Sequence, residues 1–180
     1  MSEQPEETHE GATPLQILFH AIQSDNAELL QSVLDGSTPP SLVDARNGAG
    51  DTVVLASLRA QSLEALQLLL DEEVDVDEGN RARDGDRPLH VAVQIKEVES
   101  RDWCVEQLLE AGSDPRLTNT EGLKPVELLP PAPRNNEQET DEYETTRRLL
   151  RNAEAVSGLS KADVVDEDDE SEGGPPSDEE

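Results

Sequence analysis

A short leucine-rich segment recurs along the chain at nearly constant spacing. The copies are ELLQSVL at 28–34, EALQLLL at 64–70 and CVEQLL at 104–109, and TTRRLL at 145–150 is a weaker fourth. Their last leucines are 36, 39 and 41 residues apart. Each copy places apolar side chains at positions i, i+3 and i+4, which is the pattern of an amphipathic helix. A helix that returns at a nearly fixed period indicates a solenoid of stacked repeats.

A turn motif precedes each of the last three of these helices. It reads GDTVVL at 50–55, GDRPLH at 85–90 and GLKPVE at 122–127. The glycine suits a tight turn, and proline is tolerated in the first turn of a helix because the N–H that it lacks has no helical partner there. Each unit is therefore predicted to run turn, helix, tight loop, helix.

The third unit resembles the ankyrin repeat. Its Gly-x-x-Pro-Leu-His at 85–90 is similar to the family signature G-x-T-P-L-H, with Arg87 in place of Thr, and residues 105–115 are similar to V-x-x-L-L-x-x-G-A-D-P. The other units keep parts of the motif, namely Thr13-Pro14-Leu15, Thr52, and Asn119, Gly122 and Pro125. The resemblance implies an all-α ankyrin-repeat solenoid of about four repeats. The rival tetratricopeptide repeat lacks the Gly-x-x-Pro turn and favours aromatic packing positions, whereas this chain has three aromatic residues.

Two segments lengthen the repeats. KEVESRD at 96–102 is predicted to lengthen the loop between the two helices of the third unit. PPAPRNNEQET at 130–140 is expected to do the same in the fourth unit, ahead of a helix at 141–155.

Acidic residues dominate the charge and gather at both ends of the chain. The 180 residues include 42 acids and 14 Lys or Arg, for a net charge of −28. Residues 161–180 hold ten acids and one Lys, and residues 1–10 hold four acids and no base. Neither end has the apolar periodicity that would offset the entropy of ordering, so both are predicted to be disordered. The predicted organisation is an acidic head at 1–11, ankyrin repeats over 12–157 (12–42, 43–80, 81–117 and 118–157) and an acidic tail at 158–180.

This composition disfavours several classes of function. An acidic surface repels phosphate backbones and anionic lipids, so we expect no direct nucleic-acid or membrane binding and favour a Lys/Arg-rich protein partner. No segment approaches the roughly 20 apolar residues of a membrane span, and the start of the chain lacks a signal-peptide pattern. One Cys permits neither an intrachain disulfide nor a Cys-based metal site. We expect a soluble protein of the cytoplasm and/or nucleus that is monomeric when free.

No set of residues indicates catalysis or a cofactor. The resemblance implies that the ring of His90 bonds backbone groups and ties adjacent repeats. Cys104 has the acidic neighbours Asp102 and Glu106, the opposite of what activates a thiolate, so a packing role is predicted. The chain contains no Walker loop and no G-x-S-x-G motif. It is therefore predicted not to be an enzyme and to need no cofactor or metal.

Two sets of residues are candidates for binding a partner. Ankyrin proteins bind through turn fingers and first helices that line a concave surface, and the resemblance implies that seven residues project there. They are Asp51, Arg59, Arg83, Asp84, Asp86, Gln94 and Glu121. The second set is the acidic run at 71–78, which is either a solvated loop or a docking patch for Lys/Arg-rich segments. Its acids are Asp71, Glu72, Glu73, Asp75, Asp77 and Glu78.

The tail offers two further possibilities. Ser177 lies in the S-x-x-E context of an acidophilic kinase site, so it is either a phosphorylation site or a plain tail serine. The tail also has a basic target within the chain, because bases concentrate near the turns. They are Arg81, Arg83, Arg87, Arg116 and Lys124. An alternative is therefore that the tail folds back on these bases until a partner displaces it.

Two functions from different classes stay open. A small ankyrin solenoid with an acidic tail is similar to fungal ankyrin proteins that chaperone newly made small-subunit ribosomal proteins, which implies an escort for a basic client. The alternative is a scaffold or assembly adaptor that grips one folded partner of ordinary charge, with the tail serving only solubility. Salt distinguishes them, because charge-driven binding weakens with ionic strength and a packed interface weakens little.

Overall fold

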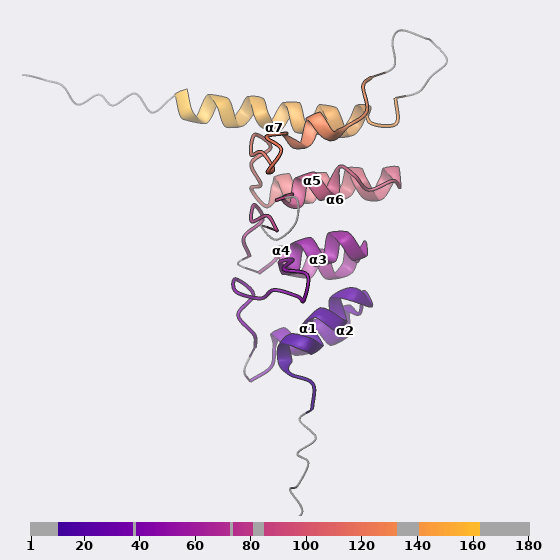
Figure 1. Ribbon diagram of the computed structural model, residues 1–180, viewed down its shortest axis with the longest axis vertical. Coiled ribbons are helices and arrows are strands. Elements are labelled where there is room, and N and C mark those ends of the chain that lie inside the picture. The colour runs from indigo at the N-terminus through magenta and orange to yellow at the C-terminus, as the bar shows by residue number, and fades with distance from the viewer. Residues whose placement is uncertain (1–10, 38, 73, 81–84, 133–140, 163–180) are drawn as a thin grey trace, which may run out of the picture.

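A computed structural model describes residues 11–37, 39–72, 74–80, 85–132 and 141–162. Within these residues all regular structure is helical, in agreement with the predicted fold class. Figure 1 shows the helices stacked in pairs along one axis, with the connecting loops on one side. The elements are α1 (Pro14–Gln23), α2 (Ala27–Leu34), α3 (Val53–Ala60), α4 (Leu63–Leu70), α5 (Pro88–Ala92), α6 (Val98–Glu110), the 3-10 helix η1 (Pro125–Leu128) and α7 (Glu144–Ala162).

The same capping chemistry begins the first helix of successive repeats. The Thr13 side chain accepts a hydrogen bond from the Gln16 backbone at the start of α1, and Thr52 accepts one from the Leu55 backbone N–H, at 3.2 Å, at the start of α3. Such caps satisfy backbone donors that have no partner within the helix. Proline is the first residue of α1, α5 and η1. The predicted Pro-initiated helices are confirmed.

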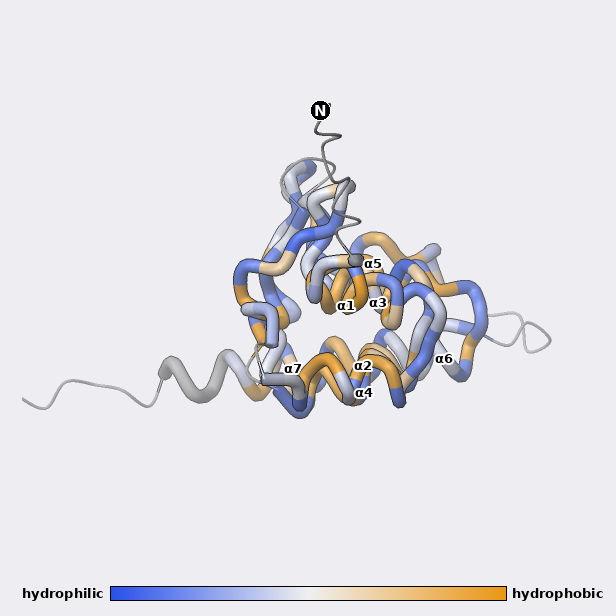
Figure 2. Tube along the Cα trace, turned by 90° about the horizontal axis from the view of Figure 1, so that it is seen from below, coloured by the Kyte–Doolittle hydropathy of each residue, from blue (hydrophilic) through white to orange (hydrophobic). Residues whose placement is uncertain are grey.

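The helices form two layers. Figure 2, a view along the stack, shows α1, α3 and α5 on one side and α2 and α4 on the other. Each first helix packs against the second helix of its own repeat and against the first helix of the next, and α2, α4, α6 and α7 follow one another in the second layer. We call α1, α3 and α5 the inner helices and α2, α4 and α6 the outer helices.

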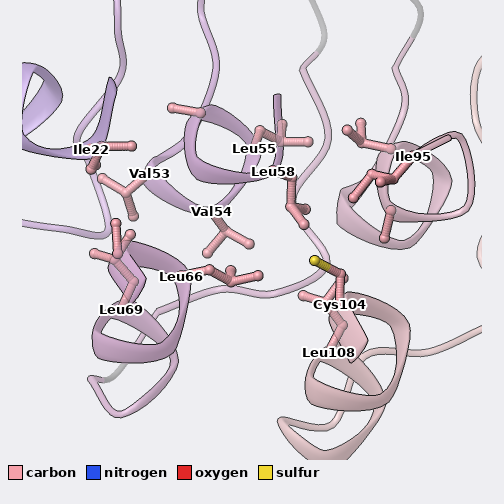
Figure 3. Packing of buried hydrophobic residues seen from close by; sticks show 14 of the residues in the cluster. Ile22, Val53, Val54, Leu55, Leu58, Leu66, Leu69, Ile95, Cys104 and Leu108 are labelled. Carbon is pink, nitrogen blue, oxygen red and sulfur yellow. The ribbon is translucent and has the colours of Figure 1, made fainter. Parts of the chain in front are cut away.

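One continuous apolar core runs between the two layers. Leu18 and Ile22 of α1 are fully buried, as are Leu66 and Leu69 of α4. Cys104 of α6 joins the same cluster and lies close to Leu66 in Figure 3. Because each repeat buries its apolar stripe against the next, no repeat has a separate core.

The third repeat differs from the sequence prediction. Residues 96–102 do not lengthen the loop, because α6 begins at Val98 and the segment forms its first turns. Glu97 caps this helix by accepting a hydrogen bond from the Glu99 backbone N–H at 3.1 Å. The inserted residues therefore lengthen α6 at its N-terminal end.

A buried arginine secures that extension. Arg101 has no exposed surface, and its guanidinium donates to Thr146 Oγ1 at 3.1 Å and to the Ile95 carbonyl at 3.2 Å. It also lies over the ring of Tyr143, 4.1 Å from the centroid. A buried charge is tolerated when its donors are satisfied in this way. Arg101 thus fixes α6 to the start of α7. The sequence analysis did not predict this contact.

The fourth repeat is incomplete. The 3-10 helix η1 stands where the first helix of the repeat is expected, and Pro130 follows soon after it. The second helix, α7, begins at Glu144 and continues to Ala162, so the expected repeat boundary at 157 falls inside a helix. Residues 133–140 of the second insertion lie outside the described residues. Long α7 covers the last face of the stack and extends beyond it (Figure 1).

The shared core predicts that one truncation weakens the whole stack. Leu66→Ala removes a fully buried side chain that lies in the cluster joining neighbouring repeats. We expect the free energy of unfolding to fall by about 2–5 kcal/mol, measured by urea denaturation. Gln67→Ala, on the exposed side of the same helix, is the control. A loss below about 1 kcal/mol for Leu66→Ala would contradict a tightly packed core.

Candidate functional site

Asparagines build the finger turns that join the repeats. The Asn47 side-chain oxygen accepts hydrogen bonds from the backbone N–H groups of Ala49 and Asp51, both at 2.9 Å. Gly50 closes the turn with φ of 82°, a conformation that glycine adopts without strain. In the fourth repeat the Asn119 oxygen likewise accepts from the Glu121 and Leu123 N–H groups, at 3.0 and 3.1 Å.

Two finger asparagines, Asn80 and Asn119, link their finger to the finger before it. Asn80 Nδ2 donates to Asp51 Oδ1 at 2.7 Å, and Asn119 Nδ2 donates to Asp86 Oδ1 at 2.8 Å. These bonds repeat from one finger to the next, and we call them the finger ladder. Asp51 is 3% exposed and Asp86 is 7% exposed. The expectation that both carboxylates project to a partner is therefore wrong, because the ladder buries them.

His90 provides a second link between repeats. Its Nε2 lies 2.8 Å from the Leu123 carbonyl of the next repeat, and its Nδ1 accepts from the Arg87 N–H at 3.4 Å. The side chain has no exposed surface. The predicted structural role of His90 is confirmed.

The other predicted concave residues differ in their surroundings. Arg59 forms an ion pair with Asp51 at 3.3 Å, so its charge is partly balanced within the protein. Gln94 is exposed but donates to Asp86 Oδ2 at 3.0 Å, which positions its amide. Glu121 is exposed at the fourth finger. Arg83 and Asp84 lie outside the described residues.

Two hollows lie along the inner helices. One, of about 380 Å³, lies between α3 and α5, and its lining includes Arg59, Gln94 and Lys96. The other, of about 350 Å³, lies between α1 and the finger around Asn47, and Phe19 and Arg46 are among its lining residues. Both combine apolar and cationic side chains, and two of these cations are ion-paired within the chain, Arg59 with Asp51 and Arg46 with Glu78.

The acidic run at 71–78 divides into two groups. Asp71, Glu72 and Asp75 are exposed. Asp77 and Glu78 are held internally, Asp77 by Ser113 Oγ at 2.6 Å and Glu78 by an ion pair with Arg46. Glu73 lies outside the described residues. Asp75, Asp77 and Glu78 also line a hollow of about 570 Å³ between the third and fourth fingers.

The bases near the turns are engaged within the chain. Arg116 bonds Asp114 at 2.8 Å, and this hydrogen bond raises the pKa of Arg116. Lys124 pairs with Glu154 of α7, and that hydrogen bond raises the pKa of Lys124. Arg87 donates to the Asp77 and Thr118 carbonyls.

The remaining members of this group, Arg81 and Arg83, lie outside the described residues, as do most of the tail and Ser177. A tail folded back on the bases, and phosphorylation of Ser177, stay predictions.

The solvent side of the outer helices carries one sign of charge. We call it the outer face, and its exposed carboxylates are Glu28, Glu64, Glu99, Glu106 and Glu110. Helices α2 and α4 contain no Lys or Arg, and Arg101 of α6 is buried. Sequence reasoning missed this face although its signal was present, because the first three leucine-rich segments, at 28–34, 64–70 and 104–109, contain no Lys or Arg.

The described residues show no metal-binding cluster or reactive thiol. Among them, no group of three or more His, Cys, Asp or Glu could hold a metal ion. Burial raises the pKa of the Cys104 thiol to about 12, so the thiolate is strongly disfavoured. The predicted packing role of Cys104 is confirmed. Of the helices described, none is long and apolar enough to cross a membrane.

The finger ladder predicts a specific loss of stability. Asn80→Ala removes the donor to Asp51 and leaves that buried carboxylate with fewer partners. We expect the free energy of unfolding to fall by about 1–3 kcal/mol in a urea titration. Asn152→Ala makes the same change at an exposed position of α7 and should have little effect. Equal losses in the two variants would show that the ladder is not a source of stability.

The buried thiol predicts a change of stability with pH. The native state keeps Cys104 protonated up to about pH 12, whereas the unfolded chain loses this proton above its ordinary pKa of 9.0. The contribution is therefore complete below pH 9 and is lost as pH rises toward 12, by about 1.4 kcal/mol per unit. Chemical denaturation of the protein and of Cys104→Ala should give curves that diverge above pH 9. Parallel curves would contradict a protonated, buried thiol.

Comparison with known proteins gives consistent matches. A family model described as ankyrin repeats, in three copies, matches residues 18–119. An ankyrin repeat-containing protein of Saccharomyces cerevisiae is 32% identical over 130 residues, covering 67% of this chain and 71% of the yeast protein.

Solved ankyrin domains are more distant. The ankyrin repeat domain of Bcl-3, a member of the IkappaB protein family, aligns with a TM-score of 0.47 and 19% identity, over 78% of this chain and 72% of that one. An ankyrin repeat domain from Acinetobacter baumannii AYE aligns with a TM-score of 0.36 and 16% identity, over 78% of this chain and 97% of that one.

The region matched by the family model contains the outer helices and all three finger asparagines, Asn47, Asn80 and Asn119. It also contains His90, which joins two repeats. The chain belongs to the ankyrin-repeat family.

Proposed function

We propose that this protein is a non-enzymatic escort that binds a Lys/Arg-rich client protein. Ankyrin repeats are in general protein–protein interaction modules. The observation that carries the proposal is the acidic outer face, which continues into the exposed acids of the run at 71–78. The net charge of −28 adds long-range attraction for any cationic partner.

The arrangement of charge supports attraction through particular surfaces. The carboxylates of the ladder, Asp51 and Asp86, are buried and bonded, so they contribute little to an encounter. Exposed carboxylates are present on the outer face and, next to it, at Asp71, Glu72 and Asp75. Complementary charge of this kind raises the rate of encounter and excludes wrong partners.

An escort of this kind acts by competition. A Lys/Arg-rich protein outside its final complex attracts polyanions without selectivity. An acidic carrier screens those charges and keeps the client soluble, in the cytoplasm or the nucleus. The repeats add shape-specific contacts, and the client leaves when its proper partner binds it more tightly.

A second candidate is favoured by the concave side. The hollows along the inner helices combine apolar side chains such as Phe19 and Val91 with the cations Arg46 and Lys96. A folded partner of ordinary charge would fit such a surface by packing. In that case the protein would be a scaffold or assembly adaptor, and the acidic ends would serve only solubility.

A salt-resolved capture experiment tests the proposal. The full chain and a version ending at Ala162 are each used to capture proteins from a native lysate. Both are washed at about 0.1 M and about 1 M salt, between which the Debye length falls from roughly 10 Å to roughly 3 Å. We expect the full chain to retain a Lys/Arg-rich protein at low salt and to release it at high salt. Mass spectrometry identifies the protein.

The shortened chain acts as the control for the tail. It keeps the whole of α7, so its repeats are those of the full chain. Weaker retention by this version would show that the tail shares in the attraction. A partner of ordinary charge that stays on both versions at high salt would contradict the escort and support the scaffold.

A further inference from the structure

The outer face contains an apolar groove that crosses three helices. Its volume is about 440 Å³. It is lined by Ala27 of α2, by Leu63, Glu64, Gln67 and Leu68 of α4, and by Trp103 of α6. Leu63, Leu68 and Trp103 are only half-buried, although each also packs against the core. Large apolar side chains are therefore presented to solvent at one place.

Helix α4 carries more apolar side chains than the core buries. The core takes Ala65, Leu66 and Leu69, which are buried. Leu63 and Leu68 remain at the edge of that stripe, beside the exposed Gln67. A surface helix normally follows its apolar stripe with charged or polar residues. The apolar side chains of α4 that the core does not bury, together with Trp103, indicate that this groove is a contact surface.

Carboxylates surround the groove. Glu64 belongs to its lining, and Glu28 follows Ala27 on α2. Glu99 and Glu106 stand four residues before and three after Trp103 on α6, which places them on the same side of that helix. All four are exposed. Two exposed bases of the second layer, Arg148 and Arg151, belong to α7 at the end of the stack and not to the helices that line the groove.

Charge decides what can occupy this groove. The two ends of the chain are themselves acidic, with four acids and no base in residues 1–10 and ten acids in residues 161–180. A second copy of the outer face would bring carboxylates against carboxylates, which is unfavourable. Both of these occupants are repelled, whereas a cationic segment of another protein is attracted.

We propose that the groove is a docking site for an amphipathic helix of the client, with leucine-type side chains facing Leu68 and Trp103 and Lys or Arg along its flanks. An amphipathic helix laid into an apolar groove is an established way of recognising a peptide. The site rests on the proposed function, because it names which part of a basic client is gripped. The groove is lined by residues of the outer helices, and Figure 2 shows two of these helices, α2 and α4, on the opposite side from α1, α3 and α5.

Trp103 makes the site directly observable. It is the single tryptophan of the chain and lines the groove, so its fluorescence reports on this site alone. The full chain is titrated with a synthetic amphipathic helical peptide of Leu and Lys. We expect saturable binding with a shift of the emission to shorter wavelength, because the peptide removes water from the indole. A Ser/Lys peptide of equal charge and a Leu/Glu peptide are the comparison probes.

Variants locate the contact. Leu68→Gln removes an apolar wall, and Glu64→Lys reverses a rim charge while Trp103 is retained. Each should weaken binding of the Leu/Lys peptide by roughly tenfold. Glu144→Lys is the matched control, since it makes the same reversal at the exposed start of α7, and it should bind within about twofold of the parent. Circular dichroism and melting curves confirm that each variant is folded.

Three outcomes would contradict the proposed docking site. Suppose that the Ser/Lys peptide binds as tightly as the Leu/Lys peptide and the tryptophan emission is unchanged. Basic peptides are then attracted by charge to another part of the surface, so the docking groove is contradicted while the proposed binding of basic clients is not. If neither cationic peptide binds at low salt, the proposed attraction of basic clients fails as well. If the Leu/Glu peptide binds equally well, or Glu144→Lys weakens binding as much as Glu64→Lys, the acidic rim does not select the occupant.

Discussion

The hydrogen bonds between successive fingers set the geometry on which the rest of the structure depends. Asn80 reaches Asp51, and Asn119 reaches Asp86, so each finger is held by the one after it. His90 adds a bond to the Leu123 carbonyl across the same kind of boundary. These bonds are buried, where an unmade partner is costly. They fix the stacking of the repeats, and the stacking in turn aligns the apolar stripes of the helices into one core.

The ladder also determines which charges remain for a partner. Asp51 and Asp86 are buried and bonded within the ladder, whereas the exposed cations Arg59 and Lys96 line a hollow along the inner helices. Exposed acids lie on the outer face and on the segment after α4. The outer face is thus acidic, whereas two cations that line the hollows of the inner helices, Arg46 and Arg59, are ion-paired within the chain. A basic client is attracted to the acidic outer face, which is why we assign this face a role in binding.

The sequence analysis correctly predicted the features that depend on patterns within one repeat. The leucine spacing predicted the helices, the turn motif predicted their proline starts, and the single motif around His90 predicted its structural role. It misjudged Asp51 and Asp86, because their partners lie a full repeat away and burial cannot be seen from position within one repeat. Arg101 was missed for the same reason, since Thr146 and Tyr143 lie in the next repeat. The segment at 96–102 looked like a loop because it is highly charged, yet capping by Glu97 and the burial of Arg101 make it helical.

Where the client lies on the solenoid is the central claim, and hydrogen–deuterium exchange tests it most directly. The purified client is added to the full chain, and exchange is compared with that of the free protein. The account predicts slower exchange in α4 and α6, whose residues line the groove, and in the exposed segment that follows α4 at Asp71 and Glu72. Protection confined to α1 and the finger around Asn47, with the outer helices unchanged, would contradict it.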